Sequence, residues 1–237
     1  MLVIKNLSKT FHNKSILKDI NVTVNRGEIA VFLGASGVGK STLLRILNNL
    51  ETFDTGTIEL DGKPLDISMV AKNHTVGFVF QSFNLFEHLN VLENITLALQ
   101  KTAGKTKKEA EEIALALLAH YGLEEKAHAS IASLSGGQKQ RVALARTLAL
   151  APKIVCLDEP SSALDPVLTA QVAQIIKKLA ADSYTVLIAT HDTGLLEQLP
   201  CTIYFMEHGS IVETARSDDF KNNSVKYPAL TAFISGK

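Results

Sequence analysis

Short runs of apolar residues alternate along this chain with longer segments of helical periodicity. Three runs are apolar at every position, which is typical of strands buried on both faces of a parallel sheet: Ile29–Leu33, Ile154–Leu157 and Val186–Ala189. Three further β-type runs lie in the first third of the chain: Leu2–Ile4, Asn21–Val24 and Thr57–Leu60, the last closed by the turn dipeptide Asp61-Gly62. The pattern predicts a small antiparallel layer beside a mainly parallel sheet.

Helical patterns fill most of the remaining chain. Thr106-Lys107-Lys108-Glu109 is a capping box, and apolar residues at helical spacing follow it until Gly122. Asp165-Pro166 predicts a second helix start, with an apolar face that runs from Leu168 to Leu179. Residues of about 82–151 contain mainly helical patterns and no convincing strand. We therefore expect a single α/β domain over residues 1–237, with a helical subdomain inserted between strands of the sheet.

Length and hydropathy place the chain among globular proteins. Its 237 residues are enough for one α/β domain with a full core, and 46% of them are hydrophobic. No window offers the roughly 18 uninterrupted apolar residues that a membrane span needs, and no secretory signal opens the chain. A cytosolic location is expected.

Charge and cysteine content argue against two classes of function. Lys plus Arg and Asp plus Glu number 24 each, so the basic excess that drives binding to nucleic acid is absent, and nucleic acid is not expected as a partner. Cys156 and Cys201 each lie in an apolar run, with no C-x-x-C spacing or neighbouring His. Both are predicted to be thiols of the core, neither disulfide-bonded nor metal-bound.

The most specific local pattern is a phosphate loop. Gly34-Ala35-Ser36-Gly37-Val38-Gly39-Lys40-Ser41 fits G-x-x-x-x-G-K-S/T and lies between a buried strand and a helix predicted to begin near Ser41. The glycines let successive N–H groups surround the phosphates, Lys40 reaches the β- and γ-phosphates, and Ser41 supplies an oxygen to Mg²⁺. Thr42 belongs to the same predicted site. The strand and helix on either side disfavour a plain Gly-rich turn, so ATP and Mg²⁺ are the expected cofactors.

Two carboxylates end the apolar run Ile154–Leu157. Asp158 and Glu159 therefore lie at the edge of the sheet where ligands of open α/β sheets bind. Asp158 can hold the magnesium ion, and Glu159 is free to accept a proton from the water that attacks the γ-phosphate. An acidic pair that merely caps the turn at Pro160 is the alternative, and the phosphate loop in the same chain disfavours it.

A second anion site is predicted at Ser135-Gly136-Gly137-Gln138. Ser135 and Gln138 form a capping box that opens a helix with Val142, Ala145 and Ala149 along one side. The unpaired N–H groups and the positive end of the helix dipole attract anions, and the two glycines carry no side chain that would keep a phosphate away. By itself the segment could also be an ordinary Gly-rich helix start.

Taken in order, these motifs resemble those of the nucleotide-binding subunits of ATP-binding cassette (ABC) transporters. The resemblance rests on the phosphate loop, Gln81 after Val76–Phe80, Leu134–Gln138, Asp158-Glu159, Ser162-Ala163-Leu164-Asp165 and His191, and it extends over nearly the whole chain. In this family the L-S-G-G-Q helix of one subunit closes over the γ-phosphate held by the other. The resemblance thus implies a dimer, with a second copy or a paralogue, that sandwiches two ATP molecules.

The resemblance also implies roles for single residues. Gln81 contacts the magnesium ion or the attacking water and senses the membrane partner, and His191 hydrogen-bonds the γ-phosphate and holds Glu159. Asp165 crosses the dimer interface. Phe11 stands where the family usually has an aromatic residue, commonly tyrosine, that stacks on adenine, and a role as a core residue beside Ile16 is the alternative.

The segment after Gln81 resembles one subfamily in particular. Importers of polar amino acids have a similar Q-x-F-N-L-F stretch, which helps to form the groove for a short helix of the membrane subunit. Phe83, Leu85 and Phe86 are therefore expected near the docking site, although about half of the apolar residues there could be core. Glu87 replaces a frequent proline, 128–133 lacks the usual Tyr-Pro, and 195–202 is atypical.

The function expected from the resemblance is that of an ATPase that drives an importer. It would lie at the cytoplasmic face of the membrane, bound to a permease and, through the permease, served by a substrate-binding protein. An exporter or lipoprotein-release ATPase shares the catalytic motifs. A non-transport ABC protein usually has two cassettes or a long coiled-coil insert, which this chain lacks, and Glu159, Gln81 and His191 argue against a module without turnover.

Overall fold

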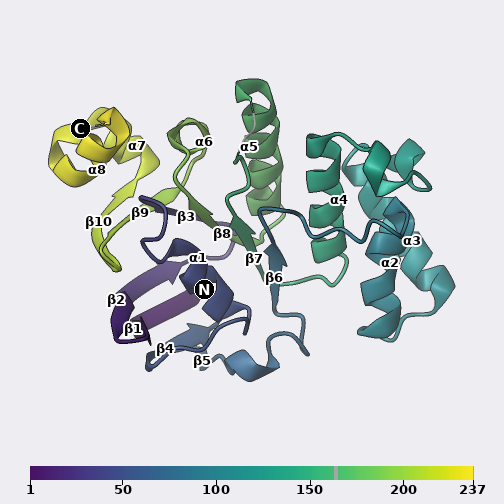
Figure 1. Cartoon of the computed structure of the whole chain (residues 1–237), viewed down its shortest axis with the longest axis horizontal. Helices are drawn as coiled ribbons and strands as arrows, with labels where there is room; N and C mark the ends of the chain where they lie inside the picture. Colours follow the sequence, from purple (N-terminus) through teal and green to yellow (C-terminus); the bar gives the residue numbers. More distant parts are fainter. Residues whose placement is uncertain (163–164, 237) are drawn as a thin grey trace.

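The computed structural model describes residues 1–162 and 165–236, so Ala163 and Leu164 of the predicted interface motif lie outside the described residues. Two sheets form the centre of the molecule (Figure 1). The smaller sheet has the order β2-β1-β4-β5, and its strands are β1 (Leu2–Phe11), β2 (Lys14–Val24), β4 (Thr55–Leu60) and β5 (Lys63–Pro64). All of its pairings are antiparallel, as predicted.

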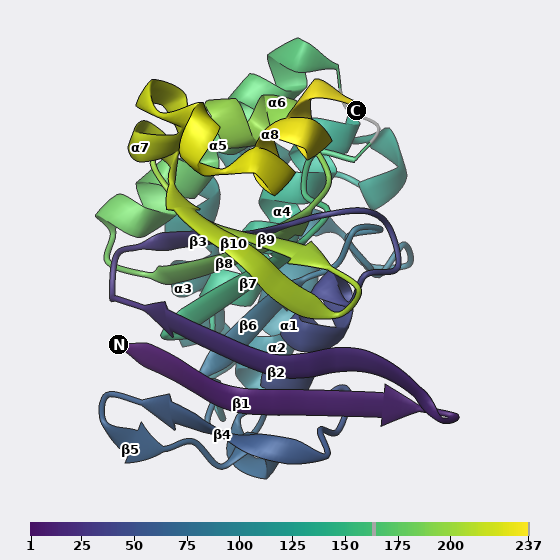
Figure 2. The same cartoon turned by 90° about the vertical axis from the view of Figure 1, so that its left-hand side faces the viewer.

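The first two strands are longer than their hydrophobic pattern predicted. Figure 2 shows β1 and β2 as long neighbours, and the expected runs Leu2–Ile4 and Asn21–Val24 cover only one end of them. Their pairing shifts register beyond Ile4, and Asn6 and Asp19 both have φ of 51°. Such bulges break the alternation of apolar and polar residues. The hydrophobic pattern therefore did not predict the remainder of each strand.

The larger sheet has six strands in the order β10-β9-β3-β8-β7-β6. Its strands are β3 (Ile29–Leu33), β6 (Val76–Val79), β7 (Ile154–Asp158), β8 (Thr185–Thr190), β9 (Thr202–Glu207) and β10 (Ser210–Arg216). Every pairing is parallel except the β9-β10 hairpin. The three continuously apolar runs thus form the centre of a mainly parallel sheet, as predicted.

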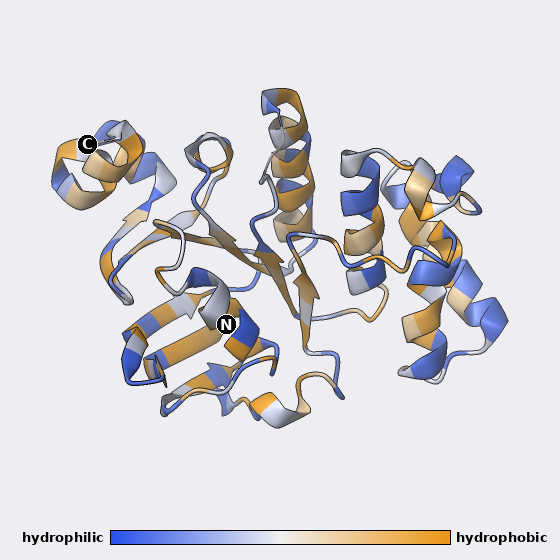
Figure 3. Ribbon diagram, viewed as in Figure 1, coloured by the Kyte–Doolittle hydropathy of each residue, from blue (hydrophilic) through white to orange (hydrophobic). Residues whose placement is uncertain are grey.

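Alternate residues of the central strands point into two different cores. In β3, Ala30 and Phe32 face the core shared with β1, β2 and α1, whereas Val31 and Leu33 face the core under the other helices. Figure 3 shows the central strands as mainly hydrophobic, in orange. Burial on both faces explains why the strands carry no polar alternation.

Helices cover the larger sheet and extend to one side of it. They are α1 (Lys40–Leu47), α2 (Val91–Lys101), α3 (Lys107–His120), α4 (Gly136–Leu148), α5 (Pro166–Ala181), α6 (Thr193–Glu197), α7 (Ser217–Asn222) and α8 (Pro228–Ser235). Between β6 and β7, where every residue is described, the chain forms α2, α3, α4 and short 3₁₀ turns but no strand. These three helices gather at the far right of Figure 1. Among the described residues, no helix is long and apolar enough to span a membrane.

Candidate nucleotide-binding and hydrolysis site

The loop from Gly34 to Gly39 joins β3 to α1, and two of its glycines are required by their surroundings. Gly34 has φ of 154° and Gly39 has φ of 114°, and a β-carbon would lie 2.4 Å from the Met206 carbonyl oxygen or 2.8 Å from that of Ile16. Neither position can take a side chain without displacing backbone. The helix that follows begins at Lys40, which confirms the predicted order of strand, loop and helix.

Lys40 lies inside this loop. Its Nζ donates to the carbonyls of Gly34, at 2.7 Å, and Ala35, at 2.9 Å, and it lies 3.9 Å from Oε1 of Glu159. Burial lowers the pKa of the Lys40 ammonium, and the nearby Glu159 and Asp158 oppose this effect. The loop and the carboxylates therefore fix a positive charge at the point where the phosphate-binding pattern requires one.

Asp158 and Ser41 meet across the sheet edge. The Ser41 hydroxyl donates to Oδ1 of Asp158 at 2.6 Å, from the first turn of α1 to the last residue of β7. Burial raises the pKa of the Asp158 carboxyl, and the bond from Ser41 works against that shift. A hydroxyl and a carboxylate side by side are the hard oxygen donors that Mg²⁺ prefers, with phosphates and water as its other ligands.

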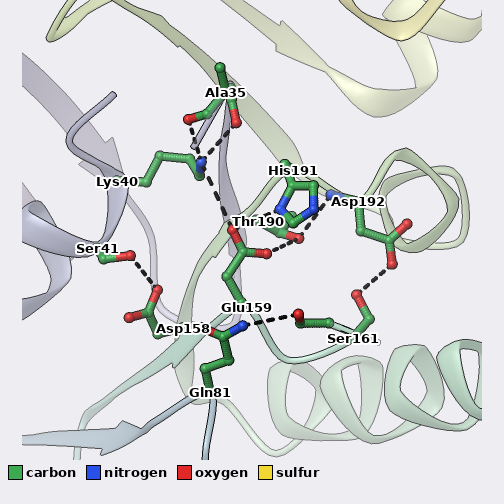
Figure 4. A network of polar contacts seen from close by, with 12 residues as sticks. Ala35, Lys40, Ser41, Gln81, Asp158, Glu159, Ser161, Thr190, His191 and Asp192 are labelled. Carbon is green, nitrogen blue, oxygen red and sulfur yellow. Dashed lines mark hydrogen bonds and ion pairs between the residues drawn. The ribbon is translucent and has the colours of Figure 1, made fainter. Parts of the chain in front are cut away.

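The Glu159 carboxylate is held by the two residues that end and follow β8. Thr190 donates its hydroxyl to Oε2 at 3.1 Å, and His191 Nδ1 lies 3.0 Å from Oε1. Figure 4 shows both side chains beside Glu159. The backbone of Glu159 has φ of 49°, and its N–H donates to the carbonyl of Ala189 at 2.8 Å. A non-glycine residue in this conformation is strained, and such strain clusters at functional sites. The arrangement presents an oriented proton acceptor.

One pocket of about 250 Å³ collects most of the predicted phosphate and catalytic residues. It is lined by Ser36, Gly37, Gly39, Lys40, Ser41, Thr42, Gln81, Glu159 and His191. Gln81 reaches it from the end of β6 and donates to the Ser162 hydroxyl at 3.0 Å. A larger pocket of about 620 Å³ adjoins the loop, between residues 13–16 and the loop residues Ala35–Val38. The two pockets share Ser36 and Gly37, so phosphate and nucleoside could lie next to each other.

The Ser135–Gln138 segment is absent from the lining of both pockets. It begins α4 with the predicted capping box, in which Gln138 N–H donates to Ser135 Oγ at 3.3 Å and Ser135 N–H to Gln138 Oε1 at 2.9 Å. A β-carbon at Gly136 would meet nothing within 4 Å, so the helix start is open. The predicted helix start is therefore present and open, and it does not line the pockets beside the chain's own phosphate loop.

Two further predicted residues have clear local contacts. Asp165 is the N-cap of α5 and accepts from Leu168 N–H at 2.9 Å, as predicted. Phe11 lies half-buried at the end of β1, with Lys9 Nζ 4.6 Å from its ring centroid. It lines neither pocket beside the loop, and in the described residues it is not packed into either core.

The docking segment divides between core and surface. Phe83 and Leu85 are partly buried and pack against the core, whereas Phe86 is 42% exposed. Phe86 lines a groove of about 490 Å³ together with Phe78, Phe80 and residues of α4. Of the three residues expected there, only Phe86 therefore lines the groove, because alternate side chains of this segment turn inward.

Some residues of the site were missed in the sequence. Thr190 holds Glu159, and its position between the run Val186–Ala189 and His191 was the available signal. Ser161 donates to Asp192, which caps α6. Gln140 of α4, which is 7% exposed, donates to the Pro160 carbonyl at 2.8 Å. These three contacts tie the loop around Glu159 to β8 and α4.

A strand-loop-helix phosphate site, a buried Asp beside the loop Ser and an oriented Glu directly after that Asp define a P-loop nucleotide-binding protein. Comparison with known proteins specifies the family. The model of the ABC transporter family matches residues 17–162. The glutamine transport ATP-binding protein GlnQ of Geobacillus stearothermophilus is 42% identical over 94% of this chain and 93% of its own length. The glutamate/aspartate import ATP-binding protein GltL of Escherichia coli is 40% identical over 93% and 92%.

Solved structures agree with the family assignment. Two structures of a bacterial ABC transporter cassette, one described as dimeric and the other as a dimeric post-hydrolysis state with ADP and Pi, are 34% identical to this chain. Each superposes with a TM-score of 0.79 over 92% of this chain and 99% of the other. The chain belongs to the ABC transporter family, and it is an ATPase of that family.

Proposed function

We propose that this chain is the ATP-hydrolysing subunit of an importer of polar amino acids and that two such subunits sandwich two ATP molecules. The observation that carries the proposal is the position of Glu159, which His191 and Thr190 orient beside Lys40 in the phosphate pocket. Hydrolysis of ATP requires a proton acceptor at that position, whereas nucleotide binding alone does not.

Within this proposal each residue of the pocket has a role. Glu159 accepts the proton of the attacking water, His191 holds Glu159 and contacts the γ-phosphate, and Gln81 positions the water. The phosphate loop, residues 34–42, cradles the phosphates. Ser41 and Asp158, with Gln81, would hold Mg²⁺, which neutralises phosphate charge in the transition state. The adjoining pocket between residues 13–16 and the loop is the proposed space for the nucleoside. Phe11, at the end of β1 just before these residues, is proposed to stack on adenine.

The second subunit completes the site. We propose that Ser135, Gly136, Gly137 and Gln138 present their helix start to the γ-phosphate held by the partner, and that Asp165 crosses the interface. The open surface at Gly136 and the separation of this segment from the chain's own pocket support the proposal. The partner is a second copy or a paralogue. Residues 1–237 are proposed to form one ATPase domain, in which about 82–151 make up the helical subdomain.

The cargo and the membrane partner follow from the relatives and from the groove. The relatives are named for transport of glutamine and for import of glutamate and aspartate, so we propose an amino acid of this class as cargo. The groove beside Phe86 is the proposed docking site for a short helix of an integral permease. A substrate-binding protein would deliver the cargo to that permease, and the subunit would lie at the cytoplasmic face of the membrane.

A charged residue introduced into the groove tests this function. Phe86→Asp should leave basal ATPase of the isolated subunit within about a factor of two, because surface substitutions rarely change stability by more than about 0.5 kcal/mol. It should abolish assembly with the co-expressed permease and uptake of labelled glutamine, glutamate or aspartate. Leu115→Asp is the matched control, since Leu115 is 40% exposed on α3 and lies outside the groove. Normal assembly and uptake in Phe86→Asp would place docking elsewhere.

A further inference from the structure

Arg146, in the last turn of α4, connects that helix to the docking segment. Its two terminal nitrogens donate to the carbonyls of Asn84, at 2.7 Å, and Phe83, at 2.8 Å. Its guanidinium carbon also lies 5.7 Å from the centre of the Phe86 ring. The planar fork of arginine holds two carbonyls in one fixed geometry, which the ammonium of lysine on its flexible stem does not impose. One side chain thus ties α4 to three residues of the segment.

The backbone that Arg146 holds is strained. Phe83 and Asn84 have φ of 61° and 47°, in the left-handed region that asparagine tolerates and phenylalanine rarely adopts. Such a conformation persists only where the surroundings fix it. The two carbonyls bonded by Arg146 belong to these two residues, so the arginine is positioned to hold this turn.

Asn94 of α2 holds the backbone of Phe86 in the same segment. It is completely buried, accepts from the Phe86 N–H at 2.8 Å and donates to the Phe86 carbonyl at 3.0 Å. Hydrogen bonds therefore fix the backbone of Phe86 to α2, and those of Arg146 fix the preceding residues Phe83 and Asn84 to α4. The groove wall and α4 are joined at one end of the helix.

The other end of α4 carries the proposed anion site for the partner's phosphate. The helix runs without interruption from Gly136 to Leu148, about 20 Å at 1.5 Å per residue. A close-packed helix of this length moves as a unit, so displacement at Arg146 displaces the helix start. Along the way, Gln140 bonds the carbonyl next to Glu159, which ties the same helix to the hydrolysis site.

We propose that Arg146 is a positioning residue that couples occupation of the groove by the permease helix to placement of Ser135–Gln138 over the partner's ATP. It acts by holding the strained turn at Phe83 and Asn84 against the last turn of α4. The inference rests on the proposed function, because that function supplies the permease helix in the groove and the partner's ATP at the start of α4. Coupling of this kind is reciprocal, so closure over ATP must also alter the docking segment.

Reciprocity allows a test without the permease. In a Glu159→Gln background, in which ATP should trap the dimer, hydrogen exchange at the Phe86 amide is measured with and without MgATP. We expect ATP to change the exchange rate by about fivefold or more, the low end of ordinary coupling. Arg146→Lys should remove this ATP effect while the dimer, measured by light scattering, still forms. Thermal unfolding of each variant shows that the fold is kept.

Arg141→Lys is the matched control. Arg141 lies on the same helix and also donates to backbone carbonyls, those of Gly137 and Tyr121, but does not contact the docking segment. The ATP effect should survive in this variant. An ATP effect that persists in Arg146→Lys, or is absent before any change to Arg146, would overturn the coupling. Neither result depends on docking, which the Phe86→Asp assembly experiment decides separately.

Discussion

His191 and Glu159, which directly follow the neighbouring strands β8 and β7, meet with Nδ1 3.0 Å from Oε1. A carboxylate accepts this bond when Nδ1 carries the imidazole proton, and His191 also lines the pocket that holds Lys40. Thr190 binds the other carboxylate oxygen. The proposed catalytic carboxylate is thus oriented from two sides before a water attacks the γ-phosphate, which is the geometry that general-base catalysis requires.

Removal of the charge of Glu159 should stop hydrolysis but keep binding. Glu159→Gln preserves shape and still allows hydrogen bonds, so turnover should fall by about 10² to 10⁴ while ATP affinity is retained. ATP should then hold the dimer together. Turnover and ATP-dependent size by light scattering are measured together, with Glu125→Gln at an exposed turn as the control. Near-normal turnover would remove Glu159 from the mechanism.

A bulky cation at Ser135 should separate binding from hydrolysis. Ser135→Arg would fill the cradle offered to the partner's γ-phosphate and abolish turnover, while the chain's own phosphate loop still binds nucleotide. Lys40→Ala should weaken nucleotide binding itself. Ser135→Ala is the control, because it loses only the helix cap, worth about 1 kcal/mol. If Ser135→Arg lost nucleotide affinity as fully as Lys40→Ala does, the site shared by two molecules would be disproved.

An aromatic face at position 11 should contribute to ATP affinity. Phe11→Ala should cost about 1 kcal/mol of binding, the scale of one aromatic stacking pair, and Phe11→Tyr should be almost silent. Because Lys9 lies over the Phe11 ring, Lys9→Met serves to test whether that contact keeps the ring in place. Nucleotide titration measures each variant. Unchanged affinity in a folded Phe11→Ala protein would assign adenine to another surface.

Both thiols should be inert in the native protein. Burial raises the pKa of Cys156 and of Cys201 to about 12, and the thiolate is the reactive form. Maleimide at pH 8 should label neither until the chain is unfolded, as mass spectrometry would show. The pKa of each thiol is higher in the folded protein than the value of about 8.5 in the unfolded chain. The contribution of the buried thiols to the free energy of unfolding is therefore fully present below about pH 8.5 and declines as the pH rises above it. Rapid native labelling of Cys201 would contradict its burial.

The sequence predicted those parts of the site whose residues are adjacent along the chain. The phosphate loop and Asp158-Glu159 could be read directly, because each forms a local pattern at the end of an apolar run. Thr190 and Glu159 are 31 positions apart, and their contact depends on β7 and β8 being neighbours, which no local pattern specifies. Arg146 and Phe83 are 63 positions apart and meet only after α4 packs beside β6.

The sequence also did not predict the bulges within strands or the directions of single side chains. The Asn6 and Asp19 bulges conceal the length of β1 and β2. The alternation that turns Phe83 and Leu85 inward and Phe86 outward depends on the strained turn that Arg146 holds. Local composition predicted an apolar segment there but could not show which of its side chains would be exposed to solvent.

The open helix start at Gly136 has a genetic consequence. Since a β-carbon there meets nothing within 4 Å, a substituted subunit should fold, escape proteolysis and accumulate like the normal one. If each ATP site borrows this helix start from the neighbouring subunit, the altered copy would disable the site of a normal partner while keeping its own phosphate loop intact. In a cell that makes both forms, such an allele should be dominant, whereas an allele that unfolds the subunit should be recessive.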